Sequence, residues 1–328
     1  MTETVQKKKY KVDKAKVIGN FAPAIGLVLV IIIFEIITGG KLLTSNNIKS
    51  MINNVVVTAI CTIGAVFVFA AGYFDMSLGG STALSAVVGA IAIVKSGSMI
   101  VGLIVCLAVA IVVGLIKGAL AAYVNVPFFI FTIILGFIFS SLVTFIMAGS
   151  SMIMLDDSEY IVKSFNISEM TTLNFIVLAA FFILCLILFR YTSLGIRSRN
   201  TGGNIIAARQ SGINVKGTTF AVFFVSAIGI ALAAFLILAR VRTVTNGTAS
   251  TLGNDVIVAL VVGGMPLSGG PRSKISAGII GACTVTVLNS GLGILGLDAG
   301  WTQVCRGLVF VIVVFVSSFS YRSKLLPR

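Results

Sequence analysis

The glycine-rich stretch Met265–Lys274 is the part of this sequence that is most similar to a known chemical motif. Its centre, Leu267-Ser268-Gly269-Gly270, is similar to a signature with which ATPases bind nucleotide phosphates through backbone amides. An ATPase also needs a phosphate-binding loop, G-x-x-x-x-G-K followed by Ser or Thr, and an apolar strand that ends in acidic residues. The sequence contains neither. We therefore expect no ATP hydrolysis by this chain, and we expect the glycines to form a tight turn.

Other catalytic groups are sparse. The sequence has no histidine, which excludes histidine-based acid–base catalysis and most zinc sites. Of its ten acidic residues, only Glu35, Asp75 and Asp255 lie in or near apolar runs, and they are far apart in the sequence. The five cysteines lie in apolar runs without a C-x-x-C motif, as expected of packing residues. The sequence predicts a protein that is not an enzyme and that holds no metal or cofactor.

The composition indicates where the remaining residues must lie. Hydrophobic residues make up 58% of the chain and charged residues 10%, whereas soluble domains average about 25% charged residues. The net charge of +14 could indicate a nucleic-acid partner, but the basic residues lie in the gaps between apolar runs. This pattern is typical of the positive-inside rule. We expect an all-α integral membrane protein that contacts lipid and no nucleic acid.

A membrane helix needs about 20 mostly apolar residues. The sequence offers about ten candidate transmembrane helices, and the basic segments favour an orientation with both the N- and C-termini in the cytoplasm. One transmembrane domain, 21–320, then lies between a basic tail, 1–20, and a C-terminal tail, 321–328. The candidate spans are 21–38, 53–71, 78–95, 98–118, 127–148, 173–190, 218–240, 255–264, 275–292 and 301–319.

Two places interrupt this regular pattern. The apolar segment 255–264 would reach only about half of a ~30 Å membrane core as a helix. The segment 72–81, GYFDMSLGGS, puts a carboxylate and three glycines between two apolar runs. Short or glycine-interrupted segments are typical of transport sites. The alternative is that each is a simple inner loop.

The longest predicted inner loop, 191–217, contains a possible short helix. Gly203 and Asn204 would begin it and Gly212 would end it, as expected of capping residues. Such a helix on the surface would need a partner to lie against. The alternative is a solvated basic loop that only fixes the membrane topology.

Four stretches together resemble a known family. They are GYFDMSLGGS at 72–81, VPFFIFT at 126–132, GNIIAARQSGI at 203–213, and a glycine-rich series from Gly263 to Leu292 that includes Leu288-Asn289-Ser290-Gly291. They are similar, in order, to the family motifs G-G-x-D-L-S-V-G-S, P-F-I-x-T-L, G-N-E-A-A-x-R-x-S-G-I and G-G-x-S-L-x-G-G with N-G-L. The chain thus resembles the permease subunits of ribose/monosaccharide-type ABC importers, related to the branched-chain amino-acid and nucleoside permeases. It departs from them at Tyr73, where glycine is usual, and at Ile205, where glutamate is usual.

The resemblance implies a type II ABC importer permease fold in the bacterial cytoplasmic (inner) membrane. It implies a pathway for a monosaccharide such as ribose, with three partners: an ABC ATPase subunit, an extracytoplasmic substrate-binding protein and a second permease subunit. The helix at 203–212 resembles the coupling helix that seats on the ATPase. The implied ATPase-coupling residues are Gly203, Asn204, Ala207, Ala208, Arg209 and Gly212.

Two further sets of residues follow from this resemblance. The outer arginines Arg240 and Arg242 could pair with acidic residues of the binding protein, or could anchor the chain at the membrane interface. The expected pathway residues offer hydroxyl, amide and aromatic groups that suit sugars: Asp75, Ser77, Asn125, Phe128, Phe129, Thr132 and Asn289. Two alternatives stay open: a nucleoside or other small polar solute as cargo, and a stand-alone secondary transporter or channel without an ATPase.

Overall fold

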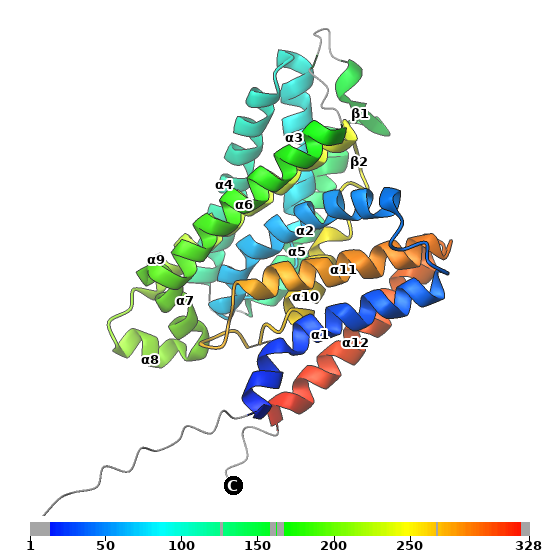
Figure 1. Ribbon diagram of the computed structural model, residues 1–328. Coiled ribbons are helices and arrows are strands. Elements are labelled where there is room, and N and C mark those ends of the chain that lie inside the picture. The colour runs from blue at the N-terminus through cyan, green and yellow to red at the C-terminus, as the bar shows by residue number, and fades with distance from the viewer. Residues whose placement is uncertain (1–13, 125–126, 158–161, 163–166, 267, 323–328) are drawn as a thin grey trace, which may run out of the picture.

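The chain folds into a bundle of long helices with one small pair of strands (Figure 1). The computed structural model describes residues 14–124, 127–157, 162, 167–266 and 268–322. Its long helices are α1 (Lys14–Ile37), α2 (Ser45–Ala70), α3 (Leu78–Ser96), α4 (Met99–Tyr123), α5 (Phe128–Ile146), α6 (Ile167–Tyr191), α9 (Val215–Val241), α11 (Ser276–Ile294) and α12 (Ala299–Arg322). The shorter elements are β1 (Met152–Met154), the 3-10 turn η1 (Leu155–Asp157), α7 (Ser193–Gly203), α8 (Ile205–Gln210), β2 (Thr243–Thr245) and α10 (Leu252–Val262).

The predicted helical membrane architecture is confirmed. Among the described residues, seven helices are long and apolar enough to cross a membrane: α2, α3, α4, α5, α6, α9 and α11. The apolar part of α1, Phe21–Ile37, and α10 are shorter. Each remaining predicted span also coincides with a helix, but a total of about ten spans stays a prediction.

The surface of the bundle is suited to lipid. Phe137 and Phe145 on α5 are 71% and 81% exposed. Rings this exposed belong in hydrocarbon rather than water. The centre of the bundle is formed instead by α2 and α9, whose inner segments are almost fully buried.

Glycines allow the central helices to pack closely. A Cβ on Gly64 of α2 would lie 3.3 Å from the Cα of Ser226 on α9, and one on Gly114 of α4 would lie 2.7 Å from the Cβ of Ala227. Small residues at such contacts let helix backbones approach each other inside a membrane. The central helices therefore form a rigid frame for the polar segments described below.

The two ends of the bundle differ (Figure 1). Helix α8, the beginning of α1 and the end of α12 lie at one end, which we call the α8 end, and the strands lie at the opposite end, the strand end. Because successive predicted spans cross the membrane in opposite directions, these three segments must lie on the same side of the membrane. Which side of the membrane the α8 end faces stays a prediction.

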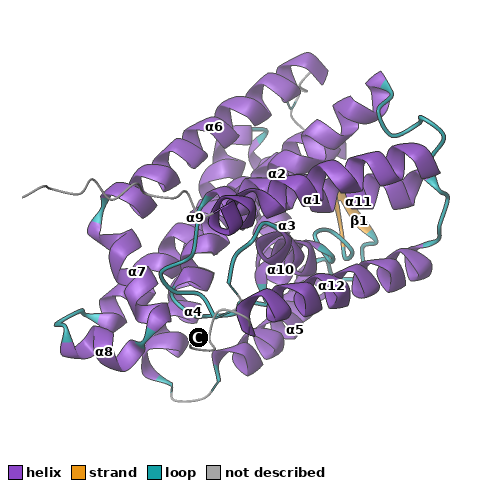
Figure 2. Cartoon of the chain, turned by 60° about the horizontal axis from the view of Figure 1, so that its bottom comes forward, coloured by secondary structure: helices purple, strands orange, loops and turns teal. Residues whose placement is uncertain are grey.

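Helix α10 is short, as its sequence predicts. Its 11 residues rise about 16 Å, or half of the membrane core. It begins near the strand end and stops inside the bundle, where Figure 2 shows it surrounded by longer helices. Gly263 and Gly264, the latter with φ of +88°, then turn the chain away from the helix.

Two features were not predicted. The strands β1 and β2 pair antiparallel, with Ile153 opposite Val244, and join the two predicted outer segments 149–172 and 241–254. Within 191–217, α7 precedes the expected short helix, so this segment is mostly helical. The expected helix over 203–212 is itself shorter, because α7 extends to Gly203 and Asn204 separates α7 from α8.

Candidate functional site

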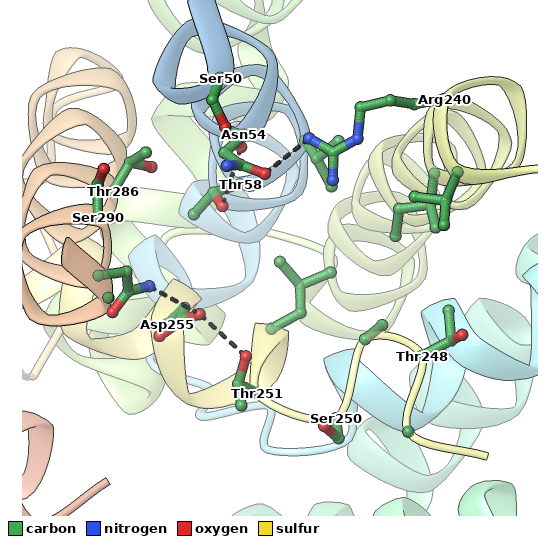
Figure 3. Close-up of a pocket in the computed structure, with 18 of the residues that line it drawn as sticks. Ser50, Asn54, Thr58, Arg240, Thr248, Ser250, Thr251, Asp255, Thr286 and Ser290 are labelled. Atoms are coloured by element: carbon green, nitrogen blue, oxygen red, sulfur yellow. Dashed lines mark hydrogen bonds between the residues drawn. The ribbon is translucent and has the colours of Figure 1, made fainter. Parts of the chain in front are cut away.

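A polar cavity of about 660 Å³ lies among α2, α9, α10, α11 and α12, near the strand end (Figure 3). The segment from Thr243 to Thr251 forms one wall. Hydroxyl and amide side chains dominate the lining, and the described lining includes no aromatic ring. A volume of this size is within the usual range of ~300–1,000 Å³ for sites of small molecules.

Asp255 is the acidic centre of the cavity. It lies in the first turn of α10, and one of its carboxylate oxygens accepts hydrogen bonds from Thr251 Oγ1 at 3.2 Å and Asn289 Nδ2 at 3.4 Å. Its other oxygen lies 3.8 Å from a guanidinium nitrogen of Arg306 on α12. A carboxylate in the first turn of a helix is also favoured by the helix dipole. The side chain is therefore held in place from three elements.

Arg240 is the second charged group near this centre. It reaches from the end of α9 toward α2, where it donates a hydrogen bond of 2.6 Å to Asn54 Oδ1 (Figure 3). No carboxylate in the part of the chain that the structure describes lies within ion-pair distance of it. Its positive charge is thus bound by an amide but not neutralised.

The lining also contains buried polar atoms without partners. Asn289 Oδ1 and Arg306 Nε are buried and make no hydrogen bond with the described residues. Buried polar atoms in proteins are almost always paired, with protein or with water. Both atoms are also closed to solvent, so they lie within the wall of the cavity and not on its open surface.

The expected pathway residues Asp75 and Ser77 lie outside this cavity. Asp75 forms a buried ion pair of 2.7 Å with Lys117 of α4, and Ser77 donates to its other oxygen from both the hydroxyl and the backbone N–H. Lys117 also donates to Ser81 Oγ at 3.3 Å. The pair is sealed by its neighbours, with side-chain exposures of 1% for Lys117 and 0% for Asp75.

The remaining expected pathway residues divide between two places. Asn289 lines the cavity. Thr132 is buried and donates to the Phe74 carbonyl, Phe128 is buried at the start of α5, and Phe129 beside it is 45% exposed. Asn125 lies outside the described residues.

The two regions meet at a contact between helix N-termini. A Cβ on Gly79 of α3 would lie 2.7 Å from the carbonyl oxygen of Ala249, and one on Gly253 of α10 would lie 3.1 Å from the Gly79 nitrogen. Only glycines permit this approach of two backbones. The start of α10 therefore closes the cavity on the side of the segment that carries Asp75.

Tyr73 contributes a phenol to the region around α5. Its hydroxyl lies 3.1 Å from Thr219 Oγ1 of α9, and its ring contacts those of Phe128 and Phe223 at centroid distances of 5.4 and 5.9 Å. These contacts join the 72–77 segment to α5 and α9. The departure from the family's glycine is thus compensated by packing.

The expected coupling residues form an exposed, capped helix. Asn204 Oδ1 accepts hydrogen bonds of 3.0 Å from the backbone N–H groups of both Ile206 and Ala207, so Asn204 is an N-cap. Ile206 is 65% exposed, whereas Ala208 is buried against the bundle. Gly212 has φ of +76° and follows the helix, as its expected role requires. Gly203 ends α7, and Arg209 is exposed in the last turn of α8.

The glycine-rich stretch packs against the end of α7, which precedes α8 in the chain. The Gly270 N–H donates a hydrogen bond of 3.0 Å to the carbonyl of Ala70 at the end of α2. A Cβ on Gly270 would lie 3.2 Å from the Cα of Gly203, and one on Gly202 would lie 2.1 Å from the Ala70 oxygen. Backbones of three segments therefore meet here, and we call this contact of Ala70, Gly202, Gly203, Gly269 and Gly270 the glycine junction. The expected tight turn at these glycines is confirmed, with φ of +66° at Gly269 and +87° at Gly270.

The two expected docking residues, Arg240 and Arg242, have different surroundings. Arg240 lines the cavity, whereas Arg242 forms an ion pair with Asp156 of η1 beside the strand pair. The Asp156 side chain is 72% exposed, so this pair lies at the rim.

Sequence reasoning missed most of the cavity, although a signal was present. Asn47, Ser50, Asn54 and Thr58 recur every three or four residues on α2 and therefore share one face of an otherwise apolar helix. On α11, Thr286, Ser290 and Gly293 follow the same spacing, and Asn289 lies next to Ser290. Two polar stripes on apolar helices indicate a shared polar space. Lys117 and Arg306 lie within the predicted spans 98–118 and 301–319, and the sequence does not indicate their partners.

Comparison with known proteins adds to this geometry. Residues 47–314 match the model of the family described as branched-chain amino acid transport system, permease component. The chain is similar to three curated permeases over most of its length. They are the ribose import permease of Bacillus subtilis (27% identity; 96% of this chain and 98% of the relative), the galactose/methyl galactoside import permease of Escherichia coli (29%; 93% and 95%) and the xylose transport system permease of Haemophilus influenzae (26%; 90% and 94%).

One solved structure shares the fold. A chain of a metal-chelate type ABC transporter in an inward-facing conformation matches with a TM-score of 0.51 and 16% identity. The match covers 89% of this chain and 98% of that one. At this identity the likeness concerns the fold alone.

Proposed function

This chain belongs to the family of permease components of the branched-chain amino acid transport system, and from that premise we propose that it forms the translocation pathway of an ATP-driven monosaccharide importer. Its relatives named above are permeases for ribose, xylose and galactose, which supports a monosaccharide. A ribose-like sugar within that class is part of the proposal and rests on the resemblance of the sequence motifs. The observation that carries the proposal is α8, a capped helix that projects Ile206 and Arg209 from the end of the bundle. A helix of this kind needs a protein surface to lie against.

Under this proposal, the α8 end faces the cytoplasm of a bacterium and α8 seats on a separate ABC ATPase subunit. A second permease subunit completes the pore, and an extracytoplasmic binding protein docks over the strand end. We retain Arg242 as a docking residue because its pair with the exposed Asp156 lies at the rim. Charges at a rim affect the rate of encounter more than the affinity. Arg240 faces the cavity instead.

The mechanism is alternating access. ATP binding closes the ATPase dimer and displaces α8, and the permease bundle changes between outward and inward openings. The glycine junction gives this displacement a path, because Gly202 and Gly203 beside α8 contact the end of α2 and the turn that leads to α11. Where two backbones touch without intervening side chains, a displacement of one segment moves the other, because the contact is closely packed.

The composition of the cavity is compatible with a sugar. Its described lining is rich in hydroxyl and amide groups. These groups suit the hydroxyls of a sugar.

The buried pair of Asp75 and Lys117 is a feature that favours a stand-alone secondary transporter, since ion-coupled carriers use charges within the membrane. The pair is shielded from solvent and saturated by Ser77 and Ser81. A coupling ion would need access to it. We therefore assign it a structural role.

Co-purification tests the proposed function. The tagged chain, extracted from membranes of its own bacterium, is expected to retain an ABC ATPase subunit. Arg209→Glu, which reverses the charge at the end of α8, is expected to lose most of that subunit. Arg197→Glu makes the same change on the exposed surface of α7 and serves as the control. Recovery of the wild-type chain without an ATPase, or an equal loss in both variants, would contradict the proposal.

A further inference from the structure

We infer that the cavity binds a hydroxyl-rich solute that also carries one negatively charged group, and that Arg240 is the residue that binds this group. The inference rests on the proposed function, because it specifies the class of cargo within it. It goes further than the neutral sugars named for the relatives, and it depends on the charges of this cavity.

The described lining of the cavity carries more positive than negative charge. The cavity lining contains two arginines and one aspartate, and the aspartate, Asp255, lies beside Arg306. Arg240 has no carboxylate partner among the described residues. Arg240 lies in the last turn of α9 and is partly exposed, so its charge is accessible to a solute in the cavity. A carboxylate on the solute would supply the missing negative charge.

Arg240 has more hydrogen-bond donors than its bond to Asn54 uses. A guanidinium carries five N–H donors, and Asn54 accepts a bond from one of its nitrogens. The remaining donors can bind a carboxylate through two parallel bonds, a geometry in which arginine is particularly effective. Asn54 fixes the position of the side chain at the edge of the cavity before the ligand arrives.

The rest of the ligand faces hydroxyl and amide groups of the lining, such as those of Ser50, Asn54 and Thr286. Hydroxyl groups both donate and accept, so a polyhydroxylated ligand can form hydrogen bonds with a lining of this kind. The cavity, at about 660 Å³, has ample room for one monosaccharide with bound water.

Asp255 sets the orientation of the ligand. It lies in the same part of the cavity as Asn289 and Arg306, because it contacts both of them. Its negative charge opposes a carboxylate near Arg306, so the anionic group of the ligand is directed to Arg240 instead. The ligand therefore has one preferred orientation.

Paired ligands test the inference directly. D-galacturonate and D-galactose differ only in a carboxylate in place of a CH₂OH group. Binding of each is measured by isothermal titration to the purified chain in phosphatidylcholine nanodiscs, which contain no net-anionic lipid. We expect galacturonate to bind at least tenfold more tightly than galactose. Arg240→Gln should lower galacturonate affinity at least tenfold and change galactose affinity less than twofold.

Two further variants separate charge from fold. Arg240→Lys keeps the positive charge and should retain most of the preference for galacturonate, and Arg197→Gln, far from the cavity on α7, should retain all of it. Equal affinities for the two ligands, an unchanged preference in Arg240→Gln, or no saturable binding of galacturonate would overturn the inference. The ATPase co-purification is independent of this assay. If the wild-type chain retains the ATPase but gives any of these contrary binding results, only the inference about the cargo is refuted. If the wild-type chain does not retain the ATPase, the proposed function is refuted.

Discussion

Lys117 Nζ lies 2.7 Å from Asp75 Oδ2 in the interior of the bundle, where both side chains are buried. The pair ties α4 to the segment between α2 and α3, and Ser77 and Ser81 occupy the adjoining hydrogen-bond positions. This segment contacts the start of α10, which closes the cavity. The ion pair therefore fixes the frame beneath the candidate site.

Removal of one partner of this pair is expected to lower the stability of the protein far more than removal of both. Lys117→Met leaves a buried carboxylate without a counter-ion, which costs about 3–5 kcal/mol. The double variant Asp75→Asn with Lys117→Met leaves no charge and should recover most of this loss. Melting temperatures of the three purified proteins test the prediction. Equal melting temperatures for the single and the double variant would refute the structural role assigned to the pair.

Tyr73 is expected to contribute mainly through its ring. Tyr73→Phe removes the contact with Thr219 Oγ1 and should cost about 1 kcal/mol, the net value of a typical hydrogen bond. Tyr73→Gly restores the residue usual in the family but removes the ring between Phe128 and Phe223, which should cost about 3–5 kcal/mol. Thermal unfolding in detergent measures both. A more stable glycine variant would mean that the ring is strained in its present position.

The helices could be predicted from the sequence, but the contacts between segments could not. Long apolar runs fix helices because a membrane leaves the backbone no other way to satisfy its hydrogen bonds. The half-length α10 was evident from its length alone. The strands β1 and β2 were not, because each has only three residues and depends on a partner about 90 residues away.

The candidate site shows the same limit. Asp75 was predicted as a pathway residue, and that role stays a prediction. Its partner Lys117 lies 42 positions further on and carries no local signal of pairing. Arg240 was interpreted from its place at the end of a span, which does not reveal that it faces Asn54. The direction of a side chain depends on which helix face meets which neighbour, and no single helix determines that.

The cap of α8 gives a prediction about coupling. Asn204→Ala removes the acceptor of two backbone N–H groups and should destabilise the helix by about 1 kcal/mol. Because α8 must be helical to seat on its partner, ATPase affinity should fall about fivefold. Asn204→Asp keeps a capping oxygen and should bind like the wild type. Quantitative pull-down with the ATPase subunit tests this, and equal binding by the alanine variant would mean that the partner imposes the helix.

The glycine junction gives the sharpest test of the proposed mechanism. A Cβ on Gly202 would lie 2.1 Å from the Ala70 oxygen, and because the obstacle is backbone, α7 and α2 must separate. Gly202→Ala should therefore lower stability by about 1–3 kcal/mol, as overpacked contacts do. It should also reduce solute uptake in proteoliposomes more than ATP hydrolysis, since α8 would still bind the ATPase but would no longer move α2.

Gly307→Ala is the matched control for this variant. Gly307 lies on α12, and a Cβ there would meet no atom within 4 Å. Alanine favours a helix over glycine by about 1 kcal/mol, so this variant should be as stable as the wild type or slightly more so, with an unchanged ratio of uptake to hydrolysis. If Gly202→Ala keeps that ratio as well, displacement of α8 must reach the pore by another route. The contact between α7 and α9 would then be the next candidate, because it joins the same end of the bundle to its centre.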